Sequence, residues 1–355
     1  MNLPNNPATA IKVESVWKVF GTRWEEALNA IHQENLGKQE VLERFDCVVG
    51  VANASFEVFE GEIFCIMGLS GSGKSTLVRH INRLLEPSSG HISVHGDDVV
   101  SLDEQALREF RNRRVAMVFQ NFGLMPHRTV RDNVAMPLEI RDMPKSERWR
   151  EADRVLKLVD LQGWEDKYAH ELSGGMQQRV GLARAIAANP DILLMDEPFS
   201  ALDPLIRRQL QDQFMDLSRL MKKTTLFITH DLDEAIRIGH RIAIMKDGEI
   251  IQIGTPDEIV TQPADDYVAD FVASISRLKF VHAKSLMTPI ETHIAHAGEL
   301  PAEAPSVSPD ASLDELISVA IHWDGPIAVV DQGQRVGAVD RVSIMQGIQG
   351  HGGAK

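Results

Sequence analysis

The chain has few cysteines: only Cys47 and Cys65 occur among its 355 residues. Two cysteines cannot form the dense disulfide framework of a small secreted domain, so we expect both to be reduced thiols in a cytoplasmic protein. Residues 1–10 lack the basic start and apolar core of a secretory signal. The chain also lacks any apolar run near the roughly 20 residues that a membrane-spanning helix needs. These absences argue against a secreted or integral membrane protein.

Basic side chains are outnumbered: 37 lysines and arginines stand against 51 aspartates and glutamates, which gives a net charge of −14 at pH 7. Nucleic acid binding relies on basic side chains that neutralise phosphates, so we expect no nucleic acid partner. An apolar content of 43% is ordinary for a soluble protein with a full core. The length suggests two domains, of which the first is much the larger.

A glycine-rich loop is the most informative feature of the chain. Residues 68–76 read GLSGSGKST and fit the phosphate-loop pattern G-x-x-x-x-G-K-[ST], after the strand-like run Ile63–Met67 that this pattern requires. Backbone N–H groups of such a loop surround the β- and γ-phosphates, Lys74 supplies a positive charge, and the Ser75 hydroxyl can ligate Mg²⁺. A chance glycine-rich loop with a lysine is the structural alternative. The residues expected to bind the nucleotide are Gly68, Ser70, Gly71, Ser72, Gly73, Lys74, Ser75 and Thr76.

Two adjacent carboxylates follow a second apolar run, because residues 192–197 read ILLMDE. A buried strand of this kind delivers Asp196 and Glu197 to its C-terminal end, where ligands of open α/β sheets collect. We expect Asp196 to hold Mg²⁺ through water and Glu197 to polarise the attacking water as a general base. A solvated pair that begins a turn before Pro198 is the alternative.

A third motif, LSGGMQQR, occupies residues 172–179. Ser173, Gly174 and Gly175 stand just before a helical run, where backbone N–H groups and the helix N-terminus make a second anion site. One bound ATP needs only one phosphate loop. We therefore expect a head-to-tail dimer, in which each ATP lies between the phosphate loop of one subunit and the Ser-Gly-Gly of the other.

Together these motifs resemble those of the nucleotide-binding subunits of ABC transporters. The resemblance implies an α/β fold of the P-loop NTPase class, with a RecA-like core, a helical subdomain and an antiparallel β subdomain. It implies ATP and Mg²⁺ as ligands, ATP hydrolysis coupled to solute import, and a homodimer of ATPase subunits. The implied partners are integral membrane permease subunits and an extracytoplasmic solute-binding protein, with the chain at the cytoplasmic face of the inner (plasma) membrane.

Four further residues occupy positions that match the family's site. Gln120, in VFQ, matches the residue that senses the γ-phosphate and faces the membrane subunit. Asp203, in SALD, matches the loop that crosses the dimer, and His230 matches the histidine that contacts the γ-phosphate. Phe20 matches the aromatic residue that stacks on adenine, although a core phenylalanine is the alternative. The resemblance implies Glu197, His230, Lys74 and Gln120 as catalytic residues, and Ser75, Gln120 and Asp196 as metal ligands.

A helical insertion narrows the resemblance. Residues from about 22 to 46 show helical apolar spacing where most such subunits have a short turn. This insertion, with GEIFCIMGLS at 61–70 and VFQNFGLMPH at 118–127, resembles the ATP-binding subunits of glycine betaine/proline betaine importers of the quaternary amine uptake family. The same motor for choline, carnitine, proline or histidine stays open.

A soluble ABC ATPase that moves no solute is the rival class. Translation factors of that class join two ATPase units in one chain, and DNA-repair members place long coiled coils between the motifs. Here only one unit occurs, and the interval from Lys74 to Asp196 is too short for such a coiled coil. A nucleotide sensor without a motor would not explain the hydrolytic residues.

Composition changes near residue 275, and we expect a nucleotide-binding domain over residues 1–275 with a helical subdomain at about 102–172. Residues 276–308 are rich in proline and alanine, which predicts a linker. The pattern that follows resembles one cystathionine β-synthase (CBS) regulatory module, with Leu286–Pro289 as a candidate remnant of a second. Six lysines and arginines against nine acidic residues in 276–355 argue against sensing of ionic strength at anionic lipid. A stabilising tail without a ligand is the alternative.

Overall fold

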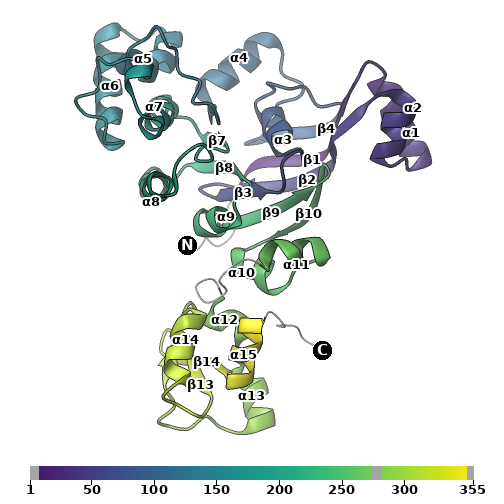
Figure 1. The fold of residues 1–355 in the computed structure, drawn as a ribbon, viewed down its shortest axis with the longest axis vertical. Coiled ribbons are helices and arrows are strands. Elements are labelled where there is room, and N and C mark those ends of the chain that lie inside the picture. The colour runs from purple at the N-terminus through teal and green to yellow at the C-terminus, as the bar shows by residue number, and fades with distance from the viewer. Residues whose placement is uncertain (1–7, 274–280, 350–355) are drawn as a thin grey trace. The chain divides into compact units, whose positions relative to one another are not determined.

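The computed structural model describes residues 8–273 and 281–349, and the chain forms two compact units, Met1–Ile250 and Ile251–Lys355 (Figure 1). The boundary between them falls earlier in the chain than the one expected near residue 275. The helices that follow residue 255 therefore group with the C-terminal part of the chain.

A six-stranded sheet forms the core of the first unit, and its last strand along the chain, β10, continues past Ile250. In spatial order its strands are β10 (Glu249–Gly254), β9 (Arg241–Lys246), β3 (Ile63–Met67), β8 (Thr224–Thr229), β7 (Ile192–Asp196) and β6 (Val115–Val118). Strand β3 pairs in parallel with both β8 and β9. Strands β3, β7 and β8 are buried along their whole length, as in a parallel sheet covered on both faces. The apolar runs at 63–67 and 192–197 predicted strands β3 and β7, and the structure confirms both.

A second, antiparallel sheet carries the helical insertion. In spatial order its strands are β2 (Val48–Phe59), β1 (Thr9–Phe20), β4 (Ser89–Val94) and β5 (Asp97–Asp98). Helices α1 (Trp24–Glu34) and α2 (Lys38–Phe45) lie between β1 and β2 in the chain. They bury apolar side chains, among them Ile31 and Val41, in a small core that they share with the adjoining ends of β1 and β2.

The other helices of the first unit are α3 (Lys74–Ile81), α4 (Glu104–Arg113), α5 (Val130–Ile140), α6 (Lys145–Leu158), the 3₁₀ helix η1 (Ala169–Glu171), α7 (Gly174–Ala187), α8 (Pro204–Met221) and α9 (Leu232–Ile238). Helices α5, α6 and α7 contact one another. The segment expected to be helical at 102–172 differs in two ways: it contains strand β6 of the core sheet, and the helical group extends into α7. Because β6 has only four residues, its apolar pattern is too short to distinguish a strand from a helix.

The second unit contains a sheet of four short strands. In spatial order they are β11 (Thr288–Pro289), β14 (Gln334–Val339), β13 (Ile327–Asp331) and β12 (Ser306–Val307). Its helices are α10 (Pro256–Thr261), α11 (Asp266–Val272), α12 (Ala283–Leu286), α13 (Ile290–Ala297), α14 (Leu313–Ala320) and α15 (Arg341–Gln349). Helix α10 contacts α12, and His282 Nδ1 lies 2.7 Å from Asp257 Oδ1 of α10. These contacts explain why α10 groups with the C-terminal part.

The described part of the expected linker, residues 281–308, is structured. It contains α12, β11, α13 and β12, and β11 pairs with β14. Thr288 and Pro289, at the end of the candidate remnant, therefore belong to the same sheet as the strands that follow them. Pro289 is compatible with this strand because β11 lies at the edge of the sheet, where a missing N–H costs no ladder hydrogen bond.

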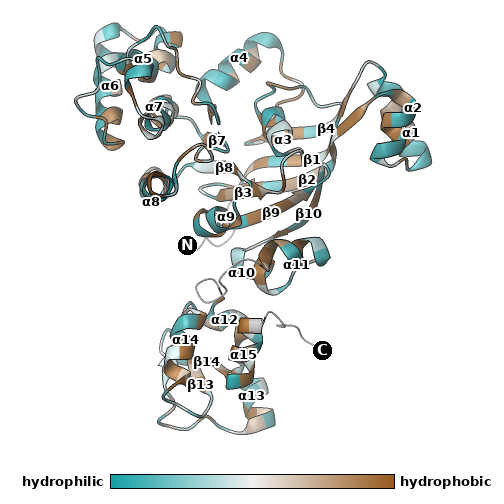
Figure 2. Cartoon of the chain, viewed as in Figure 1, coloured by the Kyte–Doolittle hydropathy of each residue, from teal (hydrophilic) through white to brown (hydrophobic). Residues whose placement is uncertain are grey.

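Hydropathy follows this arrangement. In Figure 2 the ribbons of the strands in the six-stranded sheet are mainly brown, whereas much of the ribbon of helices α1 and α4 is teal. Among the described residues, no helix combines the length and the apolar character needed to cross a bilayer.

Candidate functional site

The phosphate loop joins β3 to α3 and is held by backbone contacts. Gly73 has a φ of 100°, and a Cβ added to it would lie 2.2 Å from the Gly50 carbonyl oxygen, so only glycine fits there. Ser72 N donates to Leu69 O at 3.2 Å, and Gly248 N donates to Ser72 O at 2.9 Å. The turn between β9 and β10 thus fixes the loop from the outside.

Lys74 is the first residue of α3 and is only 4% exposed. Its ammonium donates to the carbonyl oxygens of Gly68 at 2.9 Å and Leu69 at 3.0 Å, and it lies 4.0 Å from Glu197 Oε1. Burial lowers the pKa of Lys74, and the charges of Glu197 and Asp196 oppose this shift. The loop carbonyls hold the ammonium at the mouth of the loop, where a phosphate oxygen can replace one of them.

The two predicted carboxylates end and follow strand β7. Asp196 is the last residue of the strand and is 2% exposed. Ser75 Oγ donates to Asp196 Oδ1 at 2.6 Å, so the two expected metal ligands are in direct contact. Glu197 has a φ of 46°, a left-handed conformation that non-glycine residues rarely adopt and that concentrates at functional sites.

Glu197, which follows β7, receives polar groups from the ends of the two neighbouring strands, β6 and β8. Gln120, after β6, donates from Nε2 to Glu197 Oε2 at 3.2 Å. His230, after β8, places Nδ1 3.1 Å from the same oxygen. Gln120 also donates to Ser200 Oγ at 3.3 Å. Because parallel strands end at the same edge of a sheet, residues distant in sequence meet here around one carboxylate.

Sequence reasoning missed two members of this cluster, Ser200 and Arg79. Arg79 Nη2 lies 3.1 Å from Asp196 Oδ2, the oxygen that Ser75 does not use. Arg79 stands four residues after Ser75 on α3, a spacing that places both on the same face of the helix. That spacing is the signal that could have identified it.

The Ser-Gly-Gly motif makes its contacts at the starts of α7 and α8. Ser173 caps α7 by accepting from Met176 N at 3.4 Å, and Asp203 caps α8 by accepting from Ile206 N at 3.1 Å. A Cβ on Gly175 would lie 2.6 Å from Ile206 Cγ2, so the starts of α7 and α8 pack closely. Within the described chain, no hydrogen bond or ion pair joins residues 173–175 to the phosphate loop or to Glu197.

Phe20 ends β1 and is 39% exposed, so its ring is available to a ligand. The ammonium of Lys18 lies 5.2 Å from the centre of this ring. Ser70 and Gly71 are exposed at the tip of the phosphate loop, and Thr76 is half-buried on α3.

The residues present fit a magnesium nucleotide. Ser72 Oγ is buried without a hydrogen-bond partner, and a Cβ on Gly71 would meet open space, so the loop retains room for an anion. No group of three or more histidine, cysteine or carboxylate side chains in the described ranges could hold a metal by itself. Mg²⁺ usually takes one or two protein ligands and completes its shell with phosphate and water. Ser75 and Asp196 match that pattern.

Comparisons with known proteins agree with this geometry. A family profile described as ABC transporter matches residues 51–200. The glycine betaine transport ATP-binding protein OpuAA of Bacillus subtilis (strain 168) is 52% identical over 79% of this chain and 67% of its own length. The glycine betaine/carnitine transport ATP-binding protein GbuA of Listeria monocytogenes serotype 1/2a is 43% identical over 96% of this chain and 98% of its own length.

A solved structure shares the fold of about two thirds of this chain. A dimeric ATP-binding cassette in a post-hydrolysis state, bound to ADP and Pi, is 32% identical and covers 69% of this chain and 98% of its own, with a TM-score of 0.59. The expected P-loop ATPase fold is therefore confirmed, while the CBS-like character of the second unit stays a prediction. On this sequence similarity and this fold, the chain belongs to the ATP-binding proteins of ABC transporters.

Proposed function

We propose that the chain is the ATP-hydrolysing subunit of an importer for glycine betaine, proline betaine or a related quaternary amine osmolyte. The observation that carries hydrolysis is the position of Glu197, which lies 4.0 Å from the loop lysine and accepts from Gln120 at 3.2 Å. The printed functions of the relatives, glycine betaine transport and glycine betaine/carnitine transport, support the substrate class.

The phosphate loop binds the triphosphate in this proposal. The N–H groups of residues 68–76 and the N-terminus of α3 face the phosphates, and Lys74 neutralises their charge. Phe20 stacks on adenine. Ser75, Asp196 and Gln120 would hold Mg²⁺, which when bound draws charge from the phosphate oxygens.

Glu197 takes a proton from the attacking water. Its carboxylate is 16% exposed, so water can reach it while the surrounding groups keep it oriented. Gln120 and His230 hold one carboxylate oxygen, and they leave the other to face the water and Lys74. General base catalysis of this kind contributes roughly 100-fold or more to a rate.

A second copy of the chain completes each site. Residues 173–175 and Asp203 have no hydrogen bond or ion pair with the phosphate loop among the described residues of one chain, which supports their use across a dimer. The dimeric solved relative bound to ADP and Pi supports the same arrangement. ATP would then favour the closed dimer over the open one, a population shift that drives the membrane subunits.

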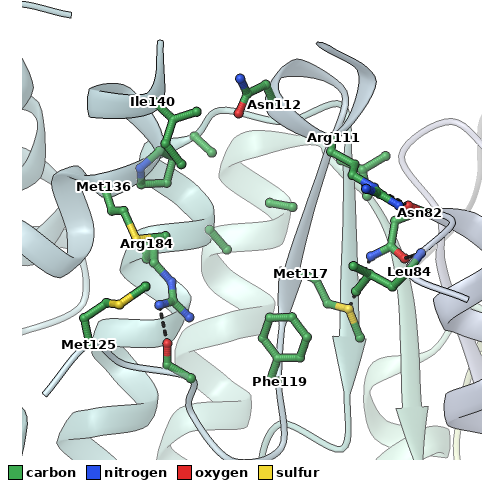
Figure 3. A pocket seen from close by; sticks show the side chains of 16 residues that line it. Asn82, Leu84, Arg111, Asn112, Met117, Phe119, Met125, Met136, Ile140 and Arg184 are labelled. Atoms are coloured by element: carbon green, nitrogen blue, oxygen red, sulfur yellow. Dashed lines mark hydrogen bonds between the residues drawn. The ribbon is translucent and has the colours of Figure 1, made fainter. Parts of the chain in front are cut away.

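An apolar pocket supports contact with a permease. It has a volume of about 400 Å³ and is lined by residues of β6 and Phe119 on one side and of helices α5 and α7 on another (Figure 3). Met117, Met125 and Met136 point into it beside Phe119, and flexible methionines suit a surface that receives a helix. Because Phe119 precedes Gln120, a permease helix in this pocket would act directly on the segment whose Gln120 side chain donates to Glu197.

The permease would position the chain at the cytoplasmic face of the plasma membrane, with an extracytoplasmic binding protein supplying solute. The second unit would act as a CBS-like regulatory module, and a stabilising tail is the alternative. Importers of choline, carnitine, proline or histidine, and a soluble ABC ATPase without a permease, are the competing functions.

Uptake of labelled glycine betaine tests the proposal. The chain is expressed with its permease and binding protein in cells that lack betaine uptake, and wild type is compared with Glu197→Gln. We expect accumulation with wild type and none with the variant. No uptake in either, with ATPase activity intact, would redirect the substrate to the other amines, and failure to recover a permease with the chain would favour the soluble ATPase.

A further inference from the structure

The ion pair between Arg79 and Asp196 is not explained by binding or hydrolysis as described above. Asp196 is the more buried partner: its side chain is 3% exposed, while that of Arg79 is 48% exposed. The guanidinium covers Oδ2 at 3.1 Å, and the Ser75 hydroxyl covers Oδ1 at 2.6 Å. Both oxygens of a proposed metal ligand are therefore occupied by groups of the chain itself.

A buried carboxylate needs a nearby positive charge, because removal of an ion from water is costly unless it is paired. Lys74 is directed elsewhere, since its ammonium donates to Gly68 O and Leu69 O. Among the ion pairs described for Asp196, Arg79 supplies the charge. The site then contains two cations, Lys74 and Arg79, and two carboxylates, Asp196 and Glu197, so it is close to neutral before any ligand binds.

We propose that Arg79 is the counterion of Asp196 when Mg²⁺ is absent. When the magnesium nucleotide binds, Mg²⁺ takes the place of Arg79 beside this carboxylate. This inference rests on the proposed nucleotide site. Arg79 suits the role because it is half-exposed on a flexible side chain, so it can leave Asp196 without disturbing the core. Its planar guanidinium stays charged at any pH of interest, unlike a histidine or a buried lysine.

The exchange has a specific consequence for nucleotide affinity. Without Mg²⁺, an uncompensated Asp196 would repel the phosphates that the loop must bind, and Arg79 cancels that repulsion. With Mg²⁺, the metal performs the same neutralisation, so Arg79 matters less. Loss of Arg79 should therefore weaken metal-free nucleotide binding much more than metal-bound binding.

Calorimetric titration of the full chain with ADP tests this, once with Mg²⁺ and once with EDTA. ADP is the probe because it has no γ-phosphate, so the ATPase reaction cannot consume it during the titration. For Arg79→Met we expect the ratio of the metal-free to the metal-bound dissociation constant to rise roughly 10-fold over wild type. Arg79→Lys should recover part of that change. In an Asp196→Asn background, Arg79→Met should leave the ratio unchanged, because the carboxylate that it neutralises is gone.

Arg113→Met is the matched control. This substitution removes the same charge from α4, where the Arg113 side chain is 66% exposed and pairs with Glu109. The ratio of the metal-free to the metal-bound dissociation constant should therefore equal that of wild type. A thermal melt of each variant verifies folding. An unchanged ratio in Arg79→Met overturns the inference, and so does an equal loss with and without metal, which would mean direct contact with phosphate. Wild type that binds no ADP in either condition would instead overturn the proposed nucleotide site.

Discussion

His230 and Glu197 lie in contact, with Nδ1 of the histidine 3.1 Å from Oε2 of the carboxylate. The histidine side chain is 53% exposed, whereas that of Glu197 is 16% exposed. The contact therefore joins a partly buried base to an exposed group, and His230 can orient Glu197 while remaining accessible to a phosphate.

We expect His230→Ala to lower the rate of ATP hydrolysis by roughly 10- to 100-fold, because Glu197 would lose one of the groups that orient it. The affinity for ADP should stay within about threefold of wild type, since the phosphate loop is unchanged. Phosphate release and calorimetry measure the two quantities. His91→Ala, at an exposed histidine outside the cluster, is the control, and an equal loss of hydrolysis in both variants would contradict the role.

We expect Gly175→Ala to impair hydrolysis without weakening ADP binding. The added Cβ would lie 2.6 Å from Ile206 Cγ2, so the Ile206 side chain or α7 itself must shift, and a shift of α7 carries residues 173–175 out of position. A displacement of about 1 Å in a site residue can cost on the order of 100-fold in rate. Phosphate release at saturating ATP measures the loss.

Gly181→Ala is the matched control for that prediction. It lies on the same helix, and its added Cβ would meet Phe122 O at 3.5 Å, an ordinary contact. Gly175→Ala combined with Ile206→Ala should recover activity, because the clashing methyl is removed. Equal activity of Gly175→Ala and Gly181→Ala would show that the close packing of α7 on α8 has no part in hydrolysis.

We expect stability to fall with acid because of His80. This histidine on α3 is fully buried, and burial lowers its pKa from 6.5 to about 4. The unfolded state therefore binds a proton at a higher pH than the folded state does, so the contribution is complete above pH 6.5 and is lost as pH falls toward 4. The full loss amounts to about 3 kcal/mol.

Urea unfolding at pH 7.5 and at pH 5 measures that dependence. In His80→Asn the difference in unfolding free energy between the two pH values should shrink by about 2 kcal/mol, because the titrating ring is absent. This difference between the two pH values stays informative even when the variant is less stable than wild type at both. An identical pH dependence in wild type and variant would rule out His80 as its source.

The sequence by itself determines the local motifs of this protein. The phosphate loop needs glycine at 73, where φ is 100°. Because such a position requires a particular residue, it is recognised in the sequence as part of a motif. Buried parallel strands need continuous apolar runs, so the sequence alone predicted β3 and β7. The ABC family followed from these motifs alone.

Tertiary structure decided what no spacing displays. Residues Gln120, Glu197 and His230 meet because β6, β7 and β8 end at one edge of the sheet, and strand order is a property of long-range pairing. The pairing of Arg79 with Asp196 depends on how α3 lies beside β7. Short elements such as β6 and β11 take their conformation from neighbouring strands, because two to four residues carry too little periodicity to specify it. Contacts between distant segments are settled only when the whole chain has packed.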